Sequence, residues 1–177
     1  MRAFIGIPIP EELREEIRKI GNEIEMRGIK LVEPENLHWT VKFFGDLDDS
    51  QTKKIMEIMN SIKGEEIEIE ISGVGTFPDS SYIRVVWIGV GQGKEKFTKF
   101  MNEVNKKFSG IGKNAEVTPH LTIGRVKFIE NKEELGEKIQ KIKNECIGKM
   151  RINQLILYES QLTPKGPVYK EIKKITW

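Results

Sequence analysis

The sequence predicts an α+β fold made of two similar lobes, each with antiparallel β-sheet and outer helices, and a cleft between them. Two observations lead to this prediction. Stretches with an apolar residue at every second position, typical of half-buried strands, alternate with stretches of helical spacing. The order strand–helix–strand–helix–strand also occurs twice, over roughly 1–77 and 80–160, before a final strand at 168–177. We therefore expect residues 1–177 to form a single two-lobed domain.

In the first half, Leu13, Ile17, Ile20 and Ile24 form one helical stripe, which Pro10 begins and Gly28 closes. Asp48 and Asp49 are candidate N-caps for a second helix. The strands expected here lie at 2–7, 30–32, 37–43 and 66–71. In the second half we expect strands at 82–90, 120–123 and 150–158 and helices at 97–108 and 131–143.

The two halves resemble each other in detail. The stripe Leu13, Ile17, Ile20 and Ile24 recurs as Phe97, Met101, Val104 and Phe108, with the same steps of four, three and four. A repeat of this size indicates two lobes related by a pseudo-two-fold axis.

The composition excludes several classes of protein. The 177 residues include 29 Lys and Arg, 27 Asp and Glu, two His and one Cys, with a net charge of +2. A hydrophobic fraction of 38% is too high for a disordered chain. One cysteine excludes an internal disulfide, and so few soft ligands argue against a zinc site; we expect no metal and no cofactor. The near-neutral charge argues against binding long nucleic acid by charge alone, but leaves room for a local basic pocket.

No part of the sequence predicts insertion into or transport across a membrane. The apolar start of the chain is short and is interrupted by Pro8 and Pro10. No stretch approaches the roughly 20 apolar residues of a spanning helix. We expect a cytoplasmic protein with no membrane partner and no obligate protein partner.

Both histidines lie in the same motif. His38-Trp39-Thr40-Val41 and His120-Leu121-Thr122-Ile123 are 82 positions apart, close to the length of the repeat. Side chains alternate along a strand, so each His shares a face with its Thr while the apolar residues point to the core. A two-fold axis would bring the two His and two Thr side chains face to face across the cleft.

This group of side chains suits phosphoryl transfer. Two imidazoles can act as general base and general acid in one reaction, and two hydroxyls can hold the phosphate oxygens. Without a metal ion, a phosphodiester needs to be activated. A strained 2′,3′-cyclic phosphate meets that need.

The sequence resembles the two-histidine phosphoesterase superfamily, and within it the archaeal RNA 2′,3′-cyclic phosphodiesterases, also called 2′-5′ RNA ligases. The resemblance runs nearly end to end. It rests on both motifs and on the segments Pro34–His38, Lys42–Gly45, Gly75–Pro78, Arg84–Trp87, Thr118–Arg125 and Leu162–Pro167.

The resemblance implies hydrolysis of the cyclic phosphate at an RNA end to a 2′-phosphate, with a weaker, reversible 2′-5′ ligation of tRNA halves and no metal. It also implies that His120 is the proton acceptor that activates water, His38 is the proton donor to the 3′ oxygen, and Thr40 and Thr122 hold the phosphate. On sequence alone the pseudo-symmetry leaves the two histidine roles exchangeable.

Four more residues are candidates for substrate binding. Arg125 breaks the alternation of its strand, and we expect a bulge at Gly124 to return it to the site, where it contacts phosphate; the alternative is a surface ion pair. Lys42 has the parity of Thr40 and could attract anions, or be a solvated lysine. Phe44 shares that parity and could stack on a base, or pack in the core. Arg84 could line the cleft.

Two other functions remain open on the sequence. One is a phosphodiesterase for small cyclic nucleotides or 2′-5′ oligonucleotides. The other is a non-catalytic RNA-end-binding module. The intact His and Thr of both motifs weigh against the second, because binding alone does not need paired titrating groups.

Overall fold

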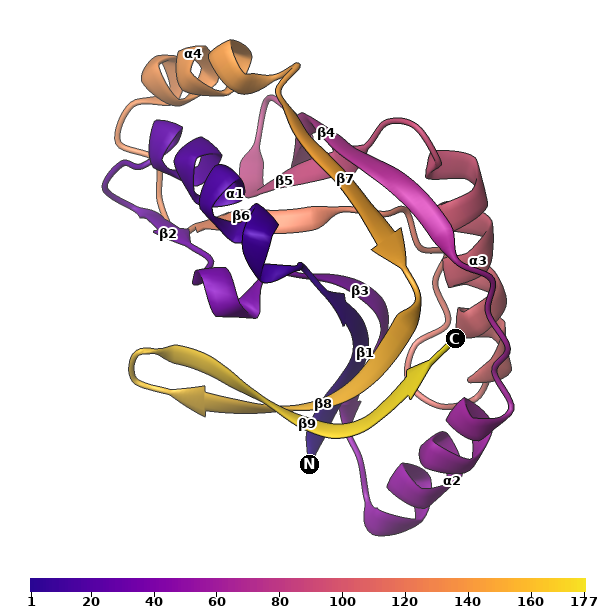
Figure 1. Ribbon diagram of the computed structural model, residues 1–177. Coiled ribbons are helices and arrows are strands. Elements are labelled where there is room, and N and C mark those ends of the chain that lie inside the picture. Colours follow the sequence, from indigo (N-terminus) through magenta and orange to yellow (C-terminus); the bar gives the residue numbers. More distant parts are fainter.

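The structure is a computed structural model that describes all 177 residues (Figure 1). Its strands are β1 Arg2–Pro8, β2 Ile29–Leu31, β3 His38–Asp46, β4 Ile67–Pro78, β5 Ile83–Val90, β6 Leu121–Val126, β7 Cys146–Ile152, β8 Gln154–Thr163 and β9 Gly166–Thr176. Its helices are α1 Glu11–Glu23, α2 Asp49–Asn60, α3 Lys94–Lys107 and α4 Lys132–Ile142, with a 3-10 turn, η1, at Pro34–Asn36. The predicted α+β class is confirmed.

All nine strands belong to one antiparallel sheet, and its order reveals the pseudo-symmetry. The order is β7-β4-β5-β6-β3-β1-β8-β9, with β2 paired to β6 outside this path. The central strands β6 and β3 carry the two histidine motifs. Each is followed outward by three further strands, so the sheet has two equivalent halves that meet at the motifs.

The halves of the sheet do not coincide with the halves of the sequence. β4 lies between β5 and β7, although it precedes the repeat boundary, and β8 pairs with β1 at the far side of the sheet. Only Asn153 separates β7 from β8. The chain therefore passes from one half of the sheet to the other within two consecutive strands.

One hydrophobic core lies under the helix-covered face of the sheet. It contains 38 buried residues from both halves. Trp39 of β3 is fully buried and packs edge-on against Phe97 of α3, with ring centroids 5.6 Å apart. On the opposite face of the sheet, β3 and β6 carry the polar residues of the motifs.

The helices begin largely where their caps predict. Asp48 forms a capping box with Gln51 at the start of α2, and the Asn131 side chain accepts a hydrogen bond from Glu134 N at the start of α4. The prediction for Gly28 was wrong: α1 already ends at Glu23, and Gly28 adopts a φ of +91° in the turn before β2. Its positive φ explains why a glycine stands there.

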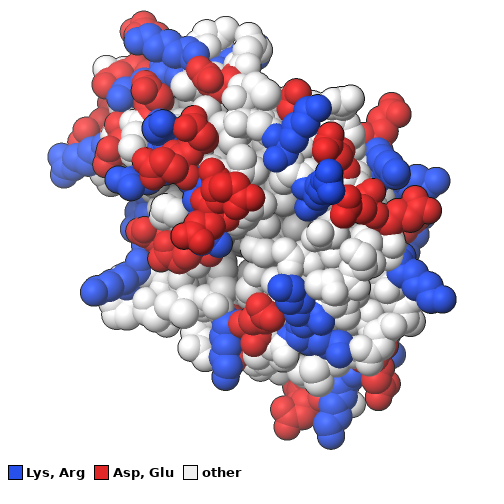
Figure 2. All heavy atoms as spheres, viewed as in Figure 1, with Lys and Arg blue, Asp and Glu red and all other residues white.

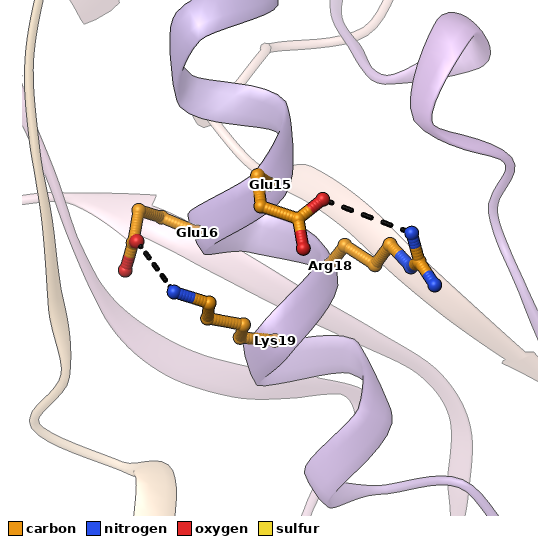
Figure 3. Close-up of polar contacts among 4 residues, drawn as sticks. All are labelled: Glu15, Glu16, Arg18 and Lys19. Carbon is orange, nitrogen blue, oxygen red and sulfur yellow. Dashed lines mark hydrogen bonds and ion pairs between the residues drawn. The ribbon is translucent and has the colours of Figure 1, made fainter.

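The solvent face of α1 carries the pairs Glu15–Arg18 and Glu16–Lys19, with N···O distances of 3.7 and 3.0 Å (Figure 3). Such exposed pairs contribute little to stability. Over the face seen in Figure 2, cations and anions are interspersed, in keeping with the net charge of +2. None of the helices has the length and apolar character needed to cross a membrane.

Candidate active site

The two histidines occupy equivalent places at the junction of the halves. His38 is the first residue of β3, and His120 directly precedes β6. The residues that follow them, Trp39 and Leu121, are paired with each other. Both are fully buried, as are Val41 and Ile123 to within 2%. The alternation predicted from the sequence is therefore confirmed for both motifs.

One pocket collects all four polar residues of the motifs. His38, Thr40, His120 and Thr122 line it together with Arg125. The remaining lining residues come from the segment that spans β2 and η1 and from the β8–β9 hairpin: Lys30, Leu31, Val32, Glu33, Asn36, Lys165, Gly166, Pro167 and Tyr169. Three of the fourteen lining residues are lysine or arginine, against one carboxylate. The pocket is thus a basic concavity in a nearly neutral protein.

Hydrogen bonds fix the tautomer of His38. Its Nδ1 lies 2.6 Å from the carbonyl oxygen of Asn36, and its Nε2 lies 2.9 Å from Thr40 Oγ1. A carbonyl oxygen only accepts, so Nδ1 donates and carries the proton. In the neutral ring Nε2 is therefore the acceptor, and it takes its hydrogen bond from the Thr40 hydroxyl.

His120 repeats this arrangement in the other half of the sheet. Its Nδ1 donates to the carbonyl oxygen of Thr118, two residues earlier, at 2.9 Å. The Nε2 of its neutral ring is likewise the acceptor. The sequence offset is the same as for His38 and Asn36, so the pseudo-symmetry extends to the groups that orient the rings.

Aromatic rings hold both imidazoles from the side. Phe4 of β1 lies with its centroid 4.7 Å from that of His38, and Tyr169 of β9 packs edge-on at 5.3 Å. Phe77 of β4 packs edge-on against His120 at 4.9 Å. These contacts restrict the rings in addition to the hydrogen bonds.

The surroundings of His38 disfavour its charged form. Burial is the main cause, and the positive charges of Arg125 and His120 act in the same direction, while the hydrogen bond to Asn36 opposes them. Together they lower the pKa of His38 from 6.5 to about 4. In the protein without substrate, His38 is therefore neutral at pH 7.

Arg125 reaches the pocket because β6 is irregular. Val86 pairs with Gly124 and Trp87 with Thr122, which leaves Ile123 as an extra residue without a partner on β5. This bulge shifts the alternation, so that Gly124 is buried and Arg125 is exposed on the pocket side. The expected bulge exists, one residue before Gly124.

The prediction for Lys42 was wrong. β3 has its own extra residue, Val41, because Gly6 pairs with Thr40 and Ile5 with Lys42. Lys42 therefore turns to the core side, where it is 2% exposed and donates from Nζ to the Lys113 carbonyl oxygen at 2.7 Å. Burial lowers the pKa of its ammonium group. Lys42 lies outside the pocket and ties β3 to the segment after α3.

Phe44 and Arg84 also lie outside the pocket. The same shift in β3 buries Phe44, which packs edge-on against Phe108. Arg84 is an extra residue of β5 without a partner on β4, because Phe77 pairs with Val85 and Pro78 with Ile83, and its exposed side chain does not line the pocket. Its guanidinium instead lies over the ring of Tyr82, 5.7 Å from the centroid.

Sequence reasoning missed the contribution of the β8–β9 hairpin. Tyr169 and Lys165 line the pocket, and two side chains tie the hairpin to the rest of the site: Asn36 Nδ2 donates to Pro167 O at 3.0 Å, and Lys30 Nζ to Lys165 O at 3.3 Å. The only signal was the Pro-Lys-Gly-Pro turn at 164–167, which indicates a hairpin but not where it lies. No group of three or more His, Cys, Asp or Glu side chains is placed to hold a metal ion.

Comparison with known proteins agrees with this geometry. A family model described as LigT-like phosphoesterase matches the chain twice, over residues 7–87 and 88–169. The chain belongs to this family. Each match contains one of the two His motifs, as expected for an internal duplication.

Relatives of this LigT-like phosphoesterase carry one functional name. A protein of Methanocaldococcus jannaschii named RNA 2′,3′-cyclic phosphodiesterase is 46% identical, covering 98% of this chain and 99% of its own. A Methanothermobacter thermautotrophicus protein of the same name is 38% identical, covering 98% and 97%.

Solved structures share the fold. TT0787 of Thermus thermophilus superposes with a TM-score of 0.80 at 23% identity, covering 99% of this chain and 97% of the other. E. coli LigT in complex with 3′-AMP gives a TM-score of 0.80 at 22% identity over the same shares.

Proposed function

We propose that this phosphoesterase hydrolyses the 2′,3′-cyclic phosphate at RNA ends and leaves a 2′-phosphate. The observation that carries the proposal is the pairing of two imidazoles with two hydroxyls and one guanidinium in a single pocket. In each ring Nδ1 is held by a carbonyl oxygen, so Nε2 is the nitrogen that can accept a proton in the base and donate one in the charged acid. The name shared by the archaeal relatives supports the choice of substrate.

In the proposed reaction His120 is the general base. Its Nε2 takes a proton from water, which attacks phosphorus in line with the P–O3′ bond. His38 is the general acid and protonates O3′ as that bond breaks, so the phosphate stays on O2′. Thr40, Thr122 and Arg125 stabilise the charge on the other phosphate oxygens. The chemistry uses no metal ion.

To act as the acid, His38 must be protonated, but its surroundings disfavour the protonated form before substrate binds. With a pKa of about 4, His38 is neutral at pH 7 while Arg125 is unpaired. A bound phosphate diester places a negative charge against Arg125 and beside His38, and this favours the imidazolium. Substrate binding thereby charges the acid. If the 5′-hydroxyl of a second tRNA half takes the place of water, the same step forms a 2′-5′ phosphodiester while His38 protonates O3′. The two histidines exchange roles only in the reverse cleavage of that linkage.

The substrate is an RNA end rather than a long duplex, because cations and anions are interspersed over the face seen in Figure 2, whereas the pocket is lined by three cationic side chains and one carboxylate. E. coli LigT, which shares the fold, has been solved in complex with 3′-AMP, and this ligand suits a site of nucleotide size. We place the enzyme in the cytoplasm, with an RNA end as its substrate and no obligate protein partner.

Product analysis tests the proposal. An RNA with a 2′,3′-cyclic phosphate should give a product whose phosphate is on O2′, and activity should survive EDTA. A product phosphorylated on O3′ would contradict the roles of the histidines, and loss of activity with EDTA would contradict the metal-free mechanism. Faster turnover of mononucleoside cyclic phosphates or 2′-5′ oligonucleotides would indicate a small-nucleotide phosphodiesterase. Binding without turnover would indicate an RNA-end-binding module.

A further inference from the structure

The segment that delivers His120 to the pocket has no regular structure. α3 ends at Lys107 and β6 starts at Leu121, and residues 113–120 belong to neither a helix nor a strand. A ring at the end of such a segment depends on whatever fixes the backbone just before it.

One side chain provides that fixation. Asn102 of α3 donates from Nδ2 to the carbonyl oxygen of Val117 at 3.0 Å, and its Oδ1 accepts from Val117 N at 2.8 Å. A further bond from Nδ2 to Thr98 O, at 2.9 Å, holds the amide on its own helix. Both backbone polar groups of Val117 are thus satisfied by a single residue, in the manner of a strand partner.

The clamp acts on the group that orients His120. Val117 directly precedes Thr118, whose carbonyl oxygen accepts from His120 Nδ1. Pro119 follows, and the residue before a proline is restricted to extended conformations. The Thr118 carbonyl is therefore fixed from both sides: by Asn102 through Val117, and by the ring of Pro119.

The equivalent segment before His38 is held differently. There the acceptor carbonyl belongs to Asn36 in η1, and Leu37 makes backbone bonds to Ile9 and Pro34. The backbone itself supports that histidine. The side-chain clamp is the feature that distinguishes the His120 half.

From this arrangement we infer that Asn102 is a positioning residue for His120, the base of the proposed function on which this inference rests. Without the clamp, the Thr118 carbonyl can turn away from Nδ1. The ring proton then redistributes to Nε2, and a protonated Nε2 cannot accept a proton from water.

Two variants test the clamp. Asn102→Ala removes both bonds, whereas Asn102→Asp keeps the acceptor for Val117 N but opposes a carboxylate to the Val117 carbonyl. Because the chain has only two histidines, NMR of the four ring nitrogens reports each tautomer directly. In both variants we expect His120 to gain Nε2–H tautomer while His38 is unchanged. For hydrolysis, kcat should fall about tenfold or more, with KM changed by less than about threefold.

Asn105→Ala is the matched control. Asn105 lies on the same helix, is buried to 7% exposure, and donates to the Val41 carbonyl at 2.7 Å, on the strand of the other motif. It should lower the melting temperature at least as much as Asn102→Ala, yet leave the His120 ring signals in place.

The inference is overturned if both Asn102 variants keep the wild-type His120 tautomer, or if Asn105→Ala shifts it equally. Should Asn102→Ala fail to fold, the near-isosteric Asn102→Asp carries the test. A wild-type protein without phosphodiesterase activity would overturn the proposed function alone, since the ring nitrogens report the clamp without any substrate.

Discussion

Trp39 and Leu121 face each other across the centre of the sheet, and theirs is the single residue pair that joins β3 to β6. Each directly follows a histidine. Since successive side chains on a strand alternate, burying both apolar partners on one face leaves His38 and His120 on the other. The register of one residue pair thus brings together two side chains that are 82 positions apart in the sequence.

Replacing either histidine with alanine should abolish most of the activity. Each ring transfers one proton, and such a contribution is worth about 10²–10⁴-fold in rate. The double variant should lose little more than the worse single variant, because the two groups act as a unit. Initial rates on a cyclic-phosphate RNA, with circular dichroism to verify the fold, measure this. Wild-type turnover in either single variant would refute the mechanism.

The stability of the protein should depend on pH through His38. In the unfolded chain this histidine binds a proton near pH 6.5, but in the folded protein only near pH 4. Between these values the unfolded state holds more protons, so the free energy of unfolding rises with pH. The stability that the folded protein gains from having His38 neutral is fully present above pH 6.5 and is lost as the pH falls to 4.

Denaturant unfolding at about pH 4.5, near the lower end of this range, and at about pH 7, above it, measures the difference. His38→Gln removes the titrating group and should flatten the dependence. An equal pH dependence in wild type and variant would show that other groups cause it.

Arg125→Ala should weaken binding of inorganic phosphate about tenfold or more, since a charge-assisted hydrogen bond is lost. Arg125→Lys should restore it only in part, because lysine lacks the planar fork. Both effects can be measured by calorimetry. In Arg125→Ala the pKa of His38 should also rise, because a nearby positive charge is gone.

Arg84→Ala is the control for Arg125, as it removes the same charge from a residue outside the pocket. Phosphate affinity should be unchanged in it. Equal weakening by both substitutions would mean that Arg125 acts only through overall charge.

Lys42→Ala should destabilise the protein without weakening substrate binding. It removes a buried side chain and leaves the Lys113 carbonyl without its donor, a loss of about 1–3 kcal/mol. Thermal unfolding and KM on the cyclic-phosphate RNA separate the two effects. A large increase in KM for Lys42→Ala would restore the expectation that Lys42 attracts the substrate.

Thr40→Val should show the opposite pattern, with reduced activity and a nearly unchanged melting temperature.

The sequence predicted the centre of the site better than its rim. The His-x-Thr spacing needs only strand alternation, and between His38 and Thr40 that alternation is unbroken. Beyond Thr40 the strand carries Val41 as an extra residue, so a parity argument gives the wrong face for Lys42 and Phe44. Bulges depend on how the partner strand fits, and a single sequence does not reveal the partner.

Arg125 was placed correctly because its position conflicted with alternation, and the cost of burying a lone charge favoured a bulge. For Tyr169 the sequence shows no such conflict with strand alternation. Its strand pairs with β8, and β8 reaches the site only because it pairs with β1 of the other half of the repeat. The periodicity of apolar residues along a sequence predicts single strands, but it does not predict which distant strands pair with each other.

The interleaving of the two repeats has a consequence for how the enzyme can come apart. β4 comes from the first half of the sequence but lies beside β5 and β7, and β8 comes from the second half but lies beside β1. Neither half of the sequence therefore contains all the strands of one half of the sheet. A cut near residue 80 would yield two fragments that need each other to bury their apolar faces. We expect such fragments to regain activity only when mixed, and the intact chain to unfold in one cooperative transition.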